Sequence, residues 1–151
     1  MFPFRIEGIP SQKEVWEDLD NILNDTYKRL DGTELRISCT CIDSGGHFTD
    51  EVYKFCKKRE IKRVFAIKGA NTPGKPIVSR PSTSNKYKAK LFTIGTDTAK
   101  ELIFARLRLD SFGEGYMHFN KKYNEEYFKQ LTAEKVINTY KNGRHVRVWK
   151  K

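Results

Sequence analysis

Asp43 stands at the end of an apolar stretch and is followed at once by the turn sequence Ser44-Gly45-Gly46. In an open α/β sheet, ligands bind outside the carboxyl ends of the strands, where this side chain would emerge. A carboxylate in that position suits a divalent metal ion. An aspartate before serine and glycine also closes turns through its own backbone, so the local pattern leaves both interpretations open.

Asp97 and Glu101 are the second acidic feature of the sequence. They are four residues apart at the start of a predicted helix, which places both carboxylates on one helix face. This pair could contribute to a metal site. Acidic residues near a helix N-terminus are also stabilised by the helix dipole, so the pair could instead stabilise the helix start without binding metal.

The histidines and cysteines offer few candidate functional residues. His47, His118 and His145 share no metal-ligand spacing. His47 lies four residues after Asp43 and is a candidate phosphate contact, or else a surface histidine at a helix start. We expect Cys41 to belong to the core, because it lies in an apolar alternating stretch with no cation nearby to lower its pKa. The nucleotide-binding spacing GxxxxGK[ST] is absent, so ATP hydrolysis is not predicted.

The charge distribution points to a polyanionic partner. Across 151 residues, 29 Lys and Arg stand against 19 Asp and Glu, for a net charge of +10. No carboxylate occurs between Ile61 and Thr96. A stretch whose charged side chains are all positive attracts phosphate groups. The alternative is that it is simply a solvated loop. The cations in this stretch are Lys62, Arg63, Lys68, Lys75, Arg80, Lys86, Lys88 and Lys90.

Several classes of protein are excluded or disfavoured. No apolar run is long enough for a membrane span, and the first residues do not resemble a secretion signal. Three cysteines without a CxxC pair predict neither a disulfide framework nor a four-ligand zinc site. We therefore expect one cytosolic domain over residues 1–151, large enough to bury its own core.

The elements that must position Asp43 alternate between helix and strand. Ser11 to Glu14 has the pattern of a capping box, and three- and four-residue apolar spacing predicts a helix from there to a stop at Asp31-Gly32. Alternation predicts a strand from Leu35 to about Asp43. A helix over 49–58 and a strand over 64–67 follow, and this order favours parallel strands. The stretch 69–88 is a long loop.

The second half of the sequence predicts a strand over 91–94 and a helix capped by Thr96, with Leu102, Ile103, Ala105 and Leu107 as its apolar positions. A strand over 116–119 and one or two helical turns over 124–131 come next. Asn142-Gly143 is the preferred centre of a tight turn, so 136–149 is predicted to be a β-hairpin.

Six sequence blocks occur in an order that resembles the nuclease domain of the lambda-type (GpA family) phage terminase large subunit. The resemblance extends from about Trp16 to Trp149. The blocks are Cys41–His47, Arg63–Ala70, Gly74–Pro76, Ile94–Glu101, Gly115–Phe119 and Gln130–Glu134.

The resemblance implies a ribonuclease-H-like α/β fold, with a mixed sheet flanked by helices and a terminal hairpin, that cuts concatemeric viral DNA during packaging. It implies Mg²⁺ or Mn²⁺ as cofactor, with Asp43 as the catalytic metal ligand and Asp97 and Glu101 as further candidates. Its matching blocks imply that Lys68 and Lys75 contact double-stranded DNA. The positive charge of the same stretch adds Arg80, Lys86, Lys88 and Lys90, with His47 and Lys100 as additional candidates.

The family's first strand region with its acidic residue and its last acidic helix have no counterpart here, and neither does the packaging ATPase. We therefore expect the central part of a nuclease domain. Two other functions stay open: a catalytically incomplete DNA-binding module, and an assembly piece that pairs through an exposed sheet edge. The resemblance also implies the terminase small subunit, the portal and the ATPase part of the large subunit as partners, in the cytoplasm of the phage's host.

Overall fold

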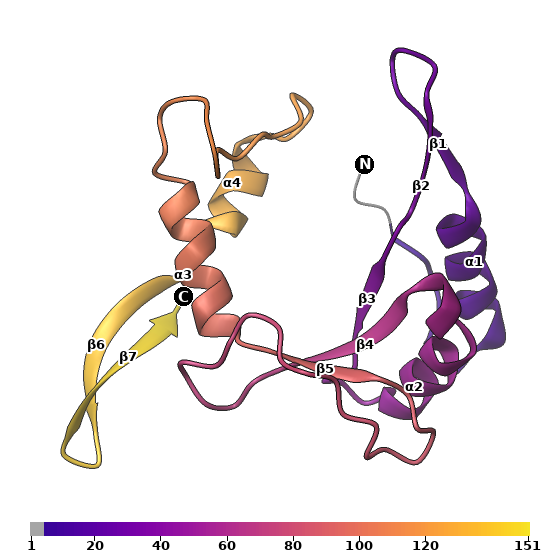
Figure 1. Cartoon of the computed structure of the whole chain (residues 1–151). Coiled ribbons are helices and arrows are strands. Elements are labelled where there is room, and N and C mark those ends of the chain that lie inside the picture. Colours follow the sequence, from indigo (N-terminus) through magenta and orange to yellow (C-terminus); the bar gives the residue numbers. More distant parts are fainter. Residues whose placement is uncertain (1–4) are drawn as a thin grey trace. The chain divides into compact units, whose positions relative to one another are not determined.

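The computed structural model describes residues 5–151, and Figure 1 labels its elements in chain order. The chain divides into two compact units, the first ending at Thr98 and the second comprising Ala99–Lys151. Helix α3 (Thr96–Arg106) begins in the first unit and continues into the second. Each unit is described separately below.

A three-stranded parallel sheet forms the centre of the first unit. Its strands are β3 (Thr40–Asp43), β4 (Val64–Gly69) and β5 (Leu91–Ile94), and β4 lies in the middle. Asp43 is paired with Ile67, and Ile67 is paired with Phe92. The predicted α/β class and parallel pairing are confirmed. All three carboxyl ends meet at one edge of the sheet, which is the edge where Asp43 lies.

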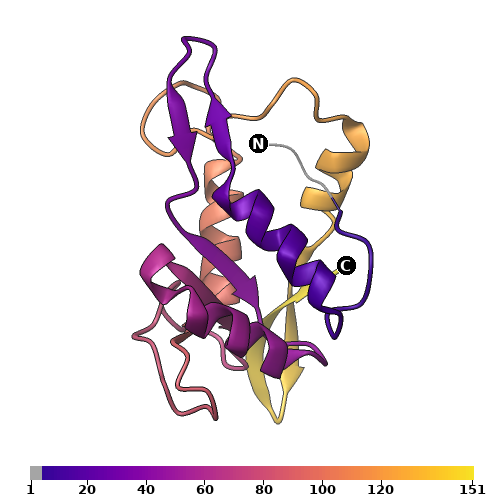
Figure 2. The same ribbon diagram turned by 90° about the vertical axis from the view of Figure 1, so that its right-hand side faces the viewer.

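Two helices cover one face of this sheet, as Figures 1 and 2 show. They are α1 (Lys13–Asn24) and α2 (Thr49–Lys58), and the short 3-10 helix η1 (Glu60–Lys62) follows α2. Val52, Phe55 and Cys56 of α2 are buried against Val64 and Ala66 of β4, as the apolar spacing of the predicted helix requires. From α1, the core receives Trp16, Leu19 and Leu23.

The prediction of a helix up to Asp31-Gly32 is wrong beyond Asn24. The next residues form a hairpin of β1 (Thr26–Lys28) and β2 (Glu34–Arg36). Gly32 has a φ of +83°, and the Asp31 carboxylate accepts a hydrogen bond from the Thr33 amide at 2.9 Å. Asp-Gly is a strong signal for a hairpin turn as well as for a helix end, and here strand pairing decides between the two.

Two smaller expectations are also wrong. Ser11 does not cap α1, because the N-cap is Gln12 and makes no side-chain cap bond. The Gln12 side chain instead accepts a hydrogen bond from the Ile9 amide at 2.8 Å. The single strand predicted from Leu35 is interrupted, since β2 ends at Arg36 and β3 starts at Thr40.

The long basic loop is attached to the outer edge of β5. Ser82 and Leu91 exchange backbone hydrogen bonds of 2.9 Å in both directions, and the Ser79 amide donates to the Thr93 carbonyl at 3.1 Å. These contacts satisfy backbone groups on the side of β5 that does not face β4. The loop is therefore an ordered border of the sheet.

The second unit contains the later part of α3, helix α4 (Glu125–Leu131), and a hairpin of β6 (Lys135–Lys141) and β7 (Arg144–Lys150). The predicted hairpin is confirmed, with Asn142 and Gly143 at φ of +52° and +74° in its turn. The turns predicted over 124–131 are also confirmed, and Asn124 caps α4 by accepting from the Tyr127 amide at 3.0 Å.

Two expectations for this unit are wrong. Residues 116–119 form no strand. Tyr116 packs on Phe112 of the same loop, and Phe119 packs on Phe128 of α4. On α3, Leu102, Ile103 and Ala105 are exposed, whereas Phe104 packs on Trp149 with ring centroids 5.0 Å apart. Three consecutive apolar residues, 102–104, do not define a single helix face. Within residues 5–151, the helices are too short or too polar to cross a membrane.

Candidate metal and nucleic-acid site

Asp43 ends β3 and lies at the carboxyl edge of the sheet. Its Oδ1 accepts a hydrogen bond from the Gly45 amide at 2.9 Å, so the carboxylate closes the turn that follows. This bond occupies one of the two carboxylate oxygens, and Oδ2 takes no part in it. The residue is exposed, so the turn-closing role and a ligand role are compatible in one side chain.

Two residues that the sequence analysis did not single out hold the Asp43 turn in place. Ser44 is almost fully buried, and both its amide and its hydroxyl donate to the Ile67 carbonyl, at 2.8 and 2.9 Å. From the other side, the Thr49 hydroxyl donates to the Ser44 carbonyl at 2.7 Å and lies 2.9 Å from the Gly46 carbonyl. The turn is thus tied to both β4 and the start of α2. A serine in a turn and a threonine at a helix start commonly form such hydrogen bonds, so these residue types were the sequence signal for this role.

A small pocket of about 230 Å³ opens beside the turn. Asp43 and His47 both line it, which brings together two of the predicted site residues. Trp16, Ile42 and Val52 supply apolar lining, so the carboxylate borders a largely apolar hollow.

The Asp97 region meets the basic loop at the same edge of the sheet. The Gly95 amide donates to the Pro76 carbonyl at 3.0 Å, and the Thr98 hydroxyl donates to the Lys75 carbonyl at 2.7 Å. A Cβ on Gly95 would lie 2.2 Å from the Lys75 carbonyl oxygen, so only glycine fits there. Lys75 and the start of α3 are therefore fixed to each other.

The edge does not bring a cluster of carboxylates together. Asp43 follows β3 and Asp97 follows β5, and β4 lies between these strands. Two strand spacings amount to about 10 Å. Among residues 5–151 there is no group of three or more His, Cys, Asp or Glu side chains placed to hold a metal ion.

Glu101 and Lys100 are engaged within the second unit. Glu101 forms an ion pair with Arg147 at 3.2 Å. Lys100 forms an ion pair with Glu134, and its ammonium lies 5.6 Å from the centre of the Trp149 ring. Arg147 of the hairpin and Glu134, just before it, thus partly neutralise the charges of these two side chains.

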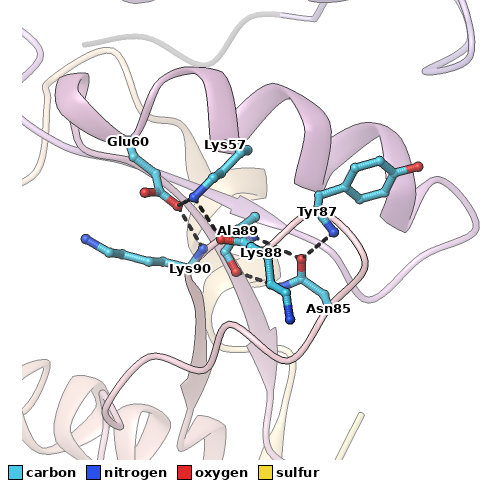
Figure 3. Close-up of polar contacts among 7 residues, drawn as sticks. All are labelled: Lys57, Glu60, Asn85, Tyr87, Lys88, Ala89 and Lys90. Atoms are coloured by element: carbon cyan, nitrogen blue, oxygen red, sulfur yellow. Dashed lines mark hydrogen bonds and ion pairs between the residues drawn. The ribbon is translucent and has the colours of Figure 1, made fainter.

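The last part of the basic loop is a built turn, drawn in Figure 3. The Asn85 carboxamide oxygen accepts from the amides of Tyr87 and Ala89, at 3.2 and 3.0 Å, and its nitrogen donates to the Ala89 carbonyl at 2.6 Å. Lys57 donates to the Lys88 carbonyl at 2.9 Å. The Asn85 side chain takes the place of backbone hydrogen-bond partners, so the turn is held although it belongs to no helix or strand.

This turn presents lysines to solvent. Lys88 has a φ of +53°, which is uncommon for a residue other than glycine. Lys86, Lys88 and Lys90 are all exposed. Over residues 5–151, none of the six predicted DNA-binding cations of the loop and β4 forms an ion pair. These are Lys68, Lys75, Arg80, Lys86, Lys88 and Lys90.

The expectation that Cys41 is a core residue is wrong. Cys41 and Cys39 are exposed, and Cys56 is the buried cysteine of the three. Ile42 faces the helices, and its neighbours on β3 therefore point to the opposite face. Local desolvation, and then the adjacent Cys39, raise the pKa of the Cys41 thiol above its usual 9.0, which disfavours a thiolate nucleophile.

The fold is an α/β domain with an exposed aspartate at the carboxyl edge of its sheet. On β4 and on the loop that borders β5, the described residues include exposed cations that form no ion pair. Residues 2–151 match the family model described as "Terminase large subunit gpA, endonuclease domain". Because the match covers nearly the whole chain, the chain belongs to this family of terminase endonuclease domains.

Two relatives agree with this assignment. The large terminase subunit of Enterobacteria phage P21 is 33% identical over 152 residues, which is 95% of this chain and 24% of that protein. The large terminase subunit of Escherichia phage lambda is 40% identical over 140 residues, which is 87% of this chain and 22% of that protein. The chain thus spans about a quarter of these relatives. No solved structure is significantly similar to it.

Proposed function

We propose that the chain contributes Asp43 as a metal ligand to a divalent-metal-dependent endonuclease that cuts double-stranded viral DNA during packaging. The observation that carries this proposal is the position of Asp43, held by Ser44 and Thr49 at the carboxyl edge of the sheet. Toward the same edge, the exposed Lys68 ends β4 with Gly69, and the exposed Lys75 is bonded to the start of α3. A ribonuclease-H-like arrangement of the complete domain is part of the proposal.

The donors at Asp43 fit one magnesium or manganese ion better than two. Magnesium keeps several water ligands and is commonly bound by one or two carboxylates together with substrate phosphates. Asp43 Oδ2 supplies one such oxygen, because Oδ1 is used by the Gly45 amide. When bound, the ion supplies Lewis-acid activation of water and of the scissile phosphate. Asp97 is a further candidate ligand, and Glu101 is a weaker one because Arg147 already partners it.

The basic residues position the DNA backbone. Lysine ammonium groups on Lys75, Lys86, Lys88 and Lys90, which are exposed on the basic loop, contact phosphates, and Lys68, Arg80 and His47 are further contacts. Such contacts set register and orientation without reading sequence. Lys100 is a weaker candidate, since Glu134 partners it.

Membership of the family supports a proposal for the partners and the location. We propose that the site acts within a large subunit that also carries an ATPase part, together with the small subunit and the portal, in the host cytoplasm.

The test is plasmid nicking with Mg²⁺ or Mn²⁺, accompanied by Mn²⁺ binding measured by electron paramagnetic resonance. Asp43→Asn should abolish nicking and weaken Mn²⁺ binding at least tenfold, while DNA binding in EDTA stays unchanged. Asp18→Asn, on the exposed side of α1, is the matched control and should behave as wild type. Equal nicking and equal Mn²⁺ affinity in Asp43→Asn would contradict the proposal. Metal-independent DNA binding without nicking in any sample would favour the binding-module alternative.

A further inference from the structure

A cluster of aromatic rings lies on the loop between α3 and α4, within the second unit. The ring centroid of Phe112 is 4.8 Å from that of Tyr116 and 5.7 Å from that of His118, and the last two are 5.1 Å apart. Phe112 is 82% exposed. An aromatic ring that is mostly exposed contributes little to the core and leaves apolar area open to solvent.

An arginine side chain lies next to the glycine that precedes Tyr116. Gly115 has a φ of +84°, and a Cβ built on it would lie 3.5 Å from Nε of Arg106. Arg106 and Arg108 are exposed, and neither forms an ion pair within residues 5–151. The rings thus lie close in sequence to Arg106, at the end of α3, and to Arg108, on a loop that also carries Asp110 and Glu114.

We propose that the ring cluster, consisting of Phe112, Tyr116 and His118, binds unpaired nucleotides of single-stranded DNA, with Arg106 next to the neighbouring Gly115. Bases of any sequence stack on aromatic rings, and the arginine attracts the phosphate of the same strand. A duplex keeps its base faces inside the stack, so this surface prefers single strands to blunt duplex. The inference uses neither Asp43 nor a metal ion, and its failure would leave the proposed cleavage function untouched.

The experiment compares fluorescence anisotropy of a labelled 15-nucleotide oligo(dT) with that of a labelled blunt 15-base-pair duplex, in EDTA. Phe112→Ala should weaken oligo(dT) binding about tenfold, the size expected for loss of one stacked base, and should leave duplex binding within about twofold. Phe112→Tyr keeps a ring and should bind oligo(dT) as wild type does.

The matched control is Tyr140→Ala, which removes another exposed ring of the same unit. Tyr140 is 67% exposed, and its ring lies 3.9 Å from that of His145. This variant should not change oligo(dT) binding. Equal losses in Phe112→Ala and Tyr140→Ala, equal losses for both DNA forms, or no loss at all would overturn the proposal. So would a change in sedimentation of the free protein with oligo(dT) affinity intact, because it would identify the cluster as a contact between copies of the chain.

Discussion

At the residue scale, the Asp43 turn shows why an aspartate, a serine and two glycines follow one another. Asp43 closes the turn, and Ser44 anchors it to β4. A Cβ on Gly45 would lie 3.2 Å from Oδ1 of Asp43, whereas a Cβ on Gly46 would meet nothing within 4 Å. The two glycines are therefore not equivalent: Gly45 leaves room for the Asp43 carboxylate, and Gly46 does not contact it.

We predict that replacing the two glycines by alanine has different effects on metal binding. Gly45→Ala should push the Asp43 carboxylate from its position and weaken Mn²⁺ binding about tenfold, a typical cost of disturbing a group that orients a metal ligand. Gly46→Ala should bind Mn²⁺ as wild type does. Electron paramagnetic resonance on both variants measures this, with thermal unfolding as a check that each is folded. An equal loss in the two variants would mean that backbone freedom, and not room for Asp43, is what matters.

At the scale of elements, an ion pair joins α1 to the residue that follows α2. Nε of Arg59 lies 2.6 Å from Oδ1 of Asp20, and Cζ of Arg59 lies 3.8 Å from the centre of the Phe55 ring. One side chain therefore links the two helices both by an ion pair and by packing. The hydrogen bond from Arg59 is the main reason that the pKa of Asp20 lies below its ordinary 3.8, and partial burial opposes it. Both side chains are mostly covered, which reduces screening by solvent.

The sign of the pH dependence follows from this lowered pKa. A carboxylate whose pKa is lower in the folded state stabilises the fold above its unfolded pKa, and the contribution is lost as the pH falls through the folded value. Asp20→Asn should therefore lower the free energy of unfolding by about 1 kcal/mol at pH 5–8, and the difference should shrink below about pH 3.8. Urea unfolding at pH 7, 5 and 3 measures it, and Asp18→Asn is the control on the same helix. A difference that persists undiminished at pH 3 would refute the assignment.

At the scale of the whole molecule, the charge of +10 is unevenly spread. The structure places much of the excess on the ordered loop that borders β5, where Asn85 holds the turn and the lysines stay exposed. Local concentration of charge matters more for DNA binding than the total, because each phosphate that a cation neutralises releases bound counterions.

We predict that the triple variant Lys86→Gln, Lys88→Gln and Lys90→Gln lowers the slope of log affinity against log salt for duplex DNA. The decrease should be about 0.9 for every phosphate that the variant no longer neutralises, so up to about 3. A control with Lys28, Arg29 and Arg36 changed to Gln removes the same charge from the β1–β2 hairpin. It should change the slope by less than about 1. Equal changes in the two triple variants would show that total charge alone drives binding.

Local sequence patterns determined much of the fold and of the candidate site. Apolar spacing predicted α2, short apolar runs predicted β4 and β5, and Asn142-Gly143 predicted the terminal hairpin. The residue types around Asp43 predicted that it ends a strand at the carboxyl edge of the sheet. The order of helix and strand predicted parallel pairing. These features depend on interactions within a few residues or on strict side-chain alternation, which the chain order already contains.

Other features were decided by tertiary contacts. Asp31-Gly32 became a hairpin turn because β1 and β2 pair, and Cys41 became exposed because the helices cover only the other face of the sheet. Glu101 and Lys100 carry charges that suit metal and DNA, yet Arg147 and Glu134, which are distant in sequence, partner them. Which side chain meets which across such distances depends on how the elements pack, and no local spacing encodes it.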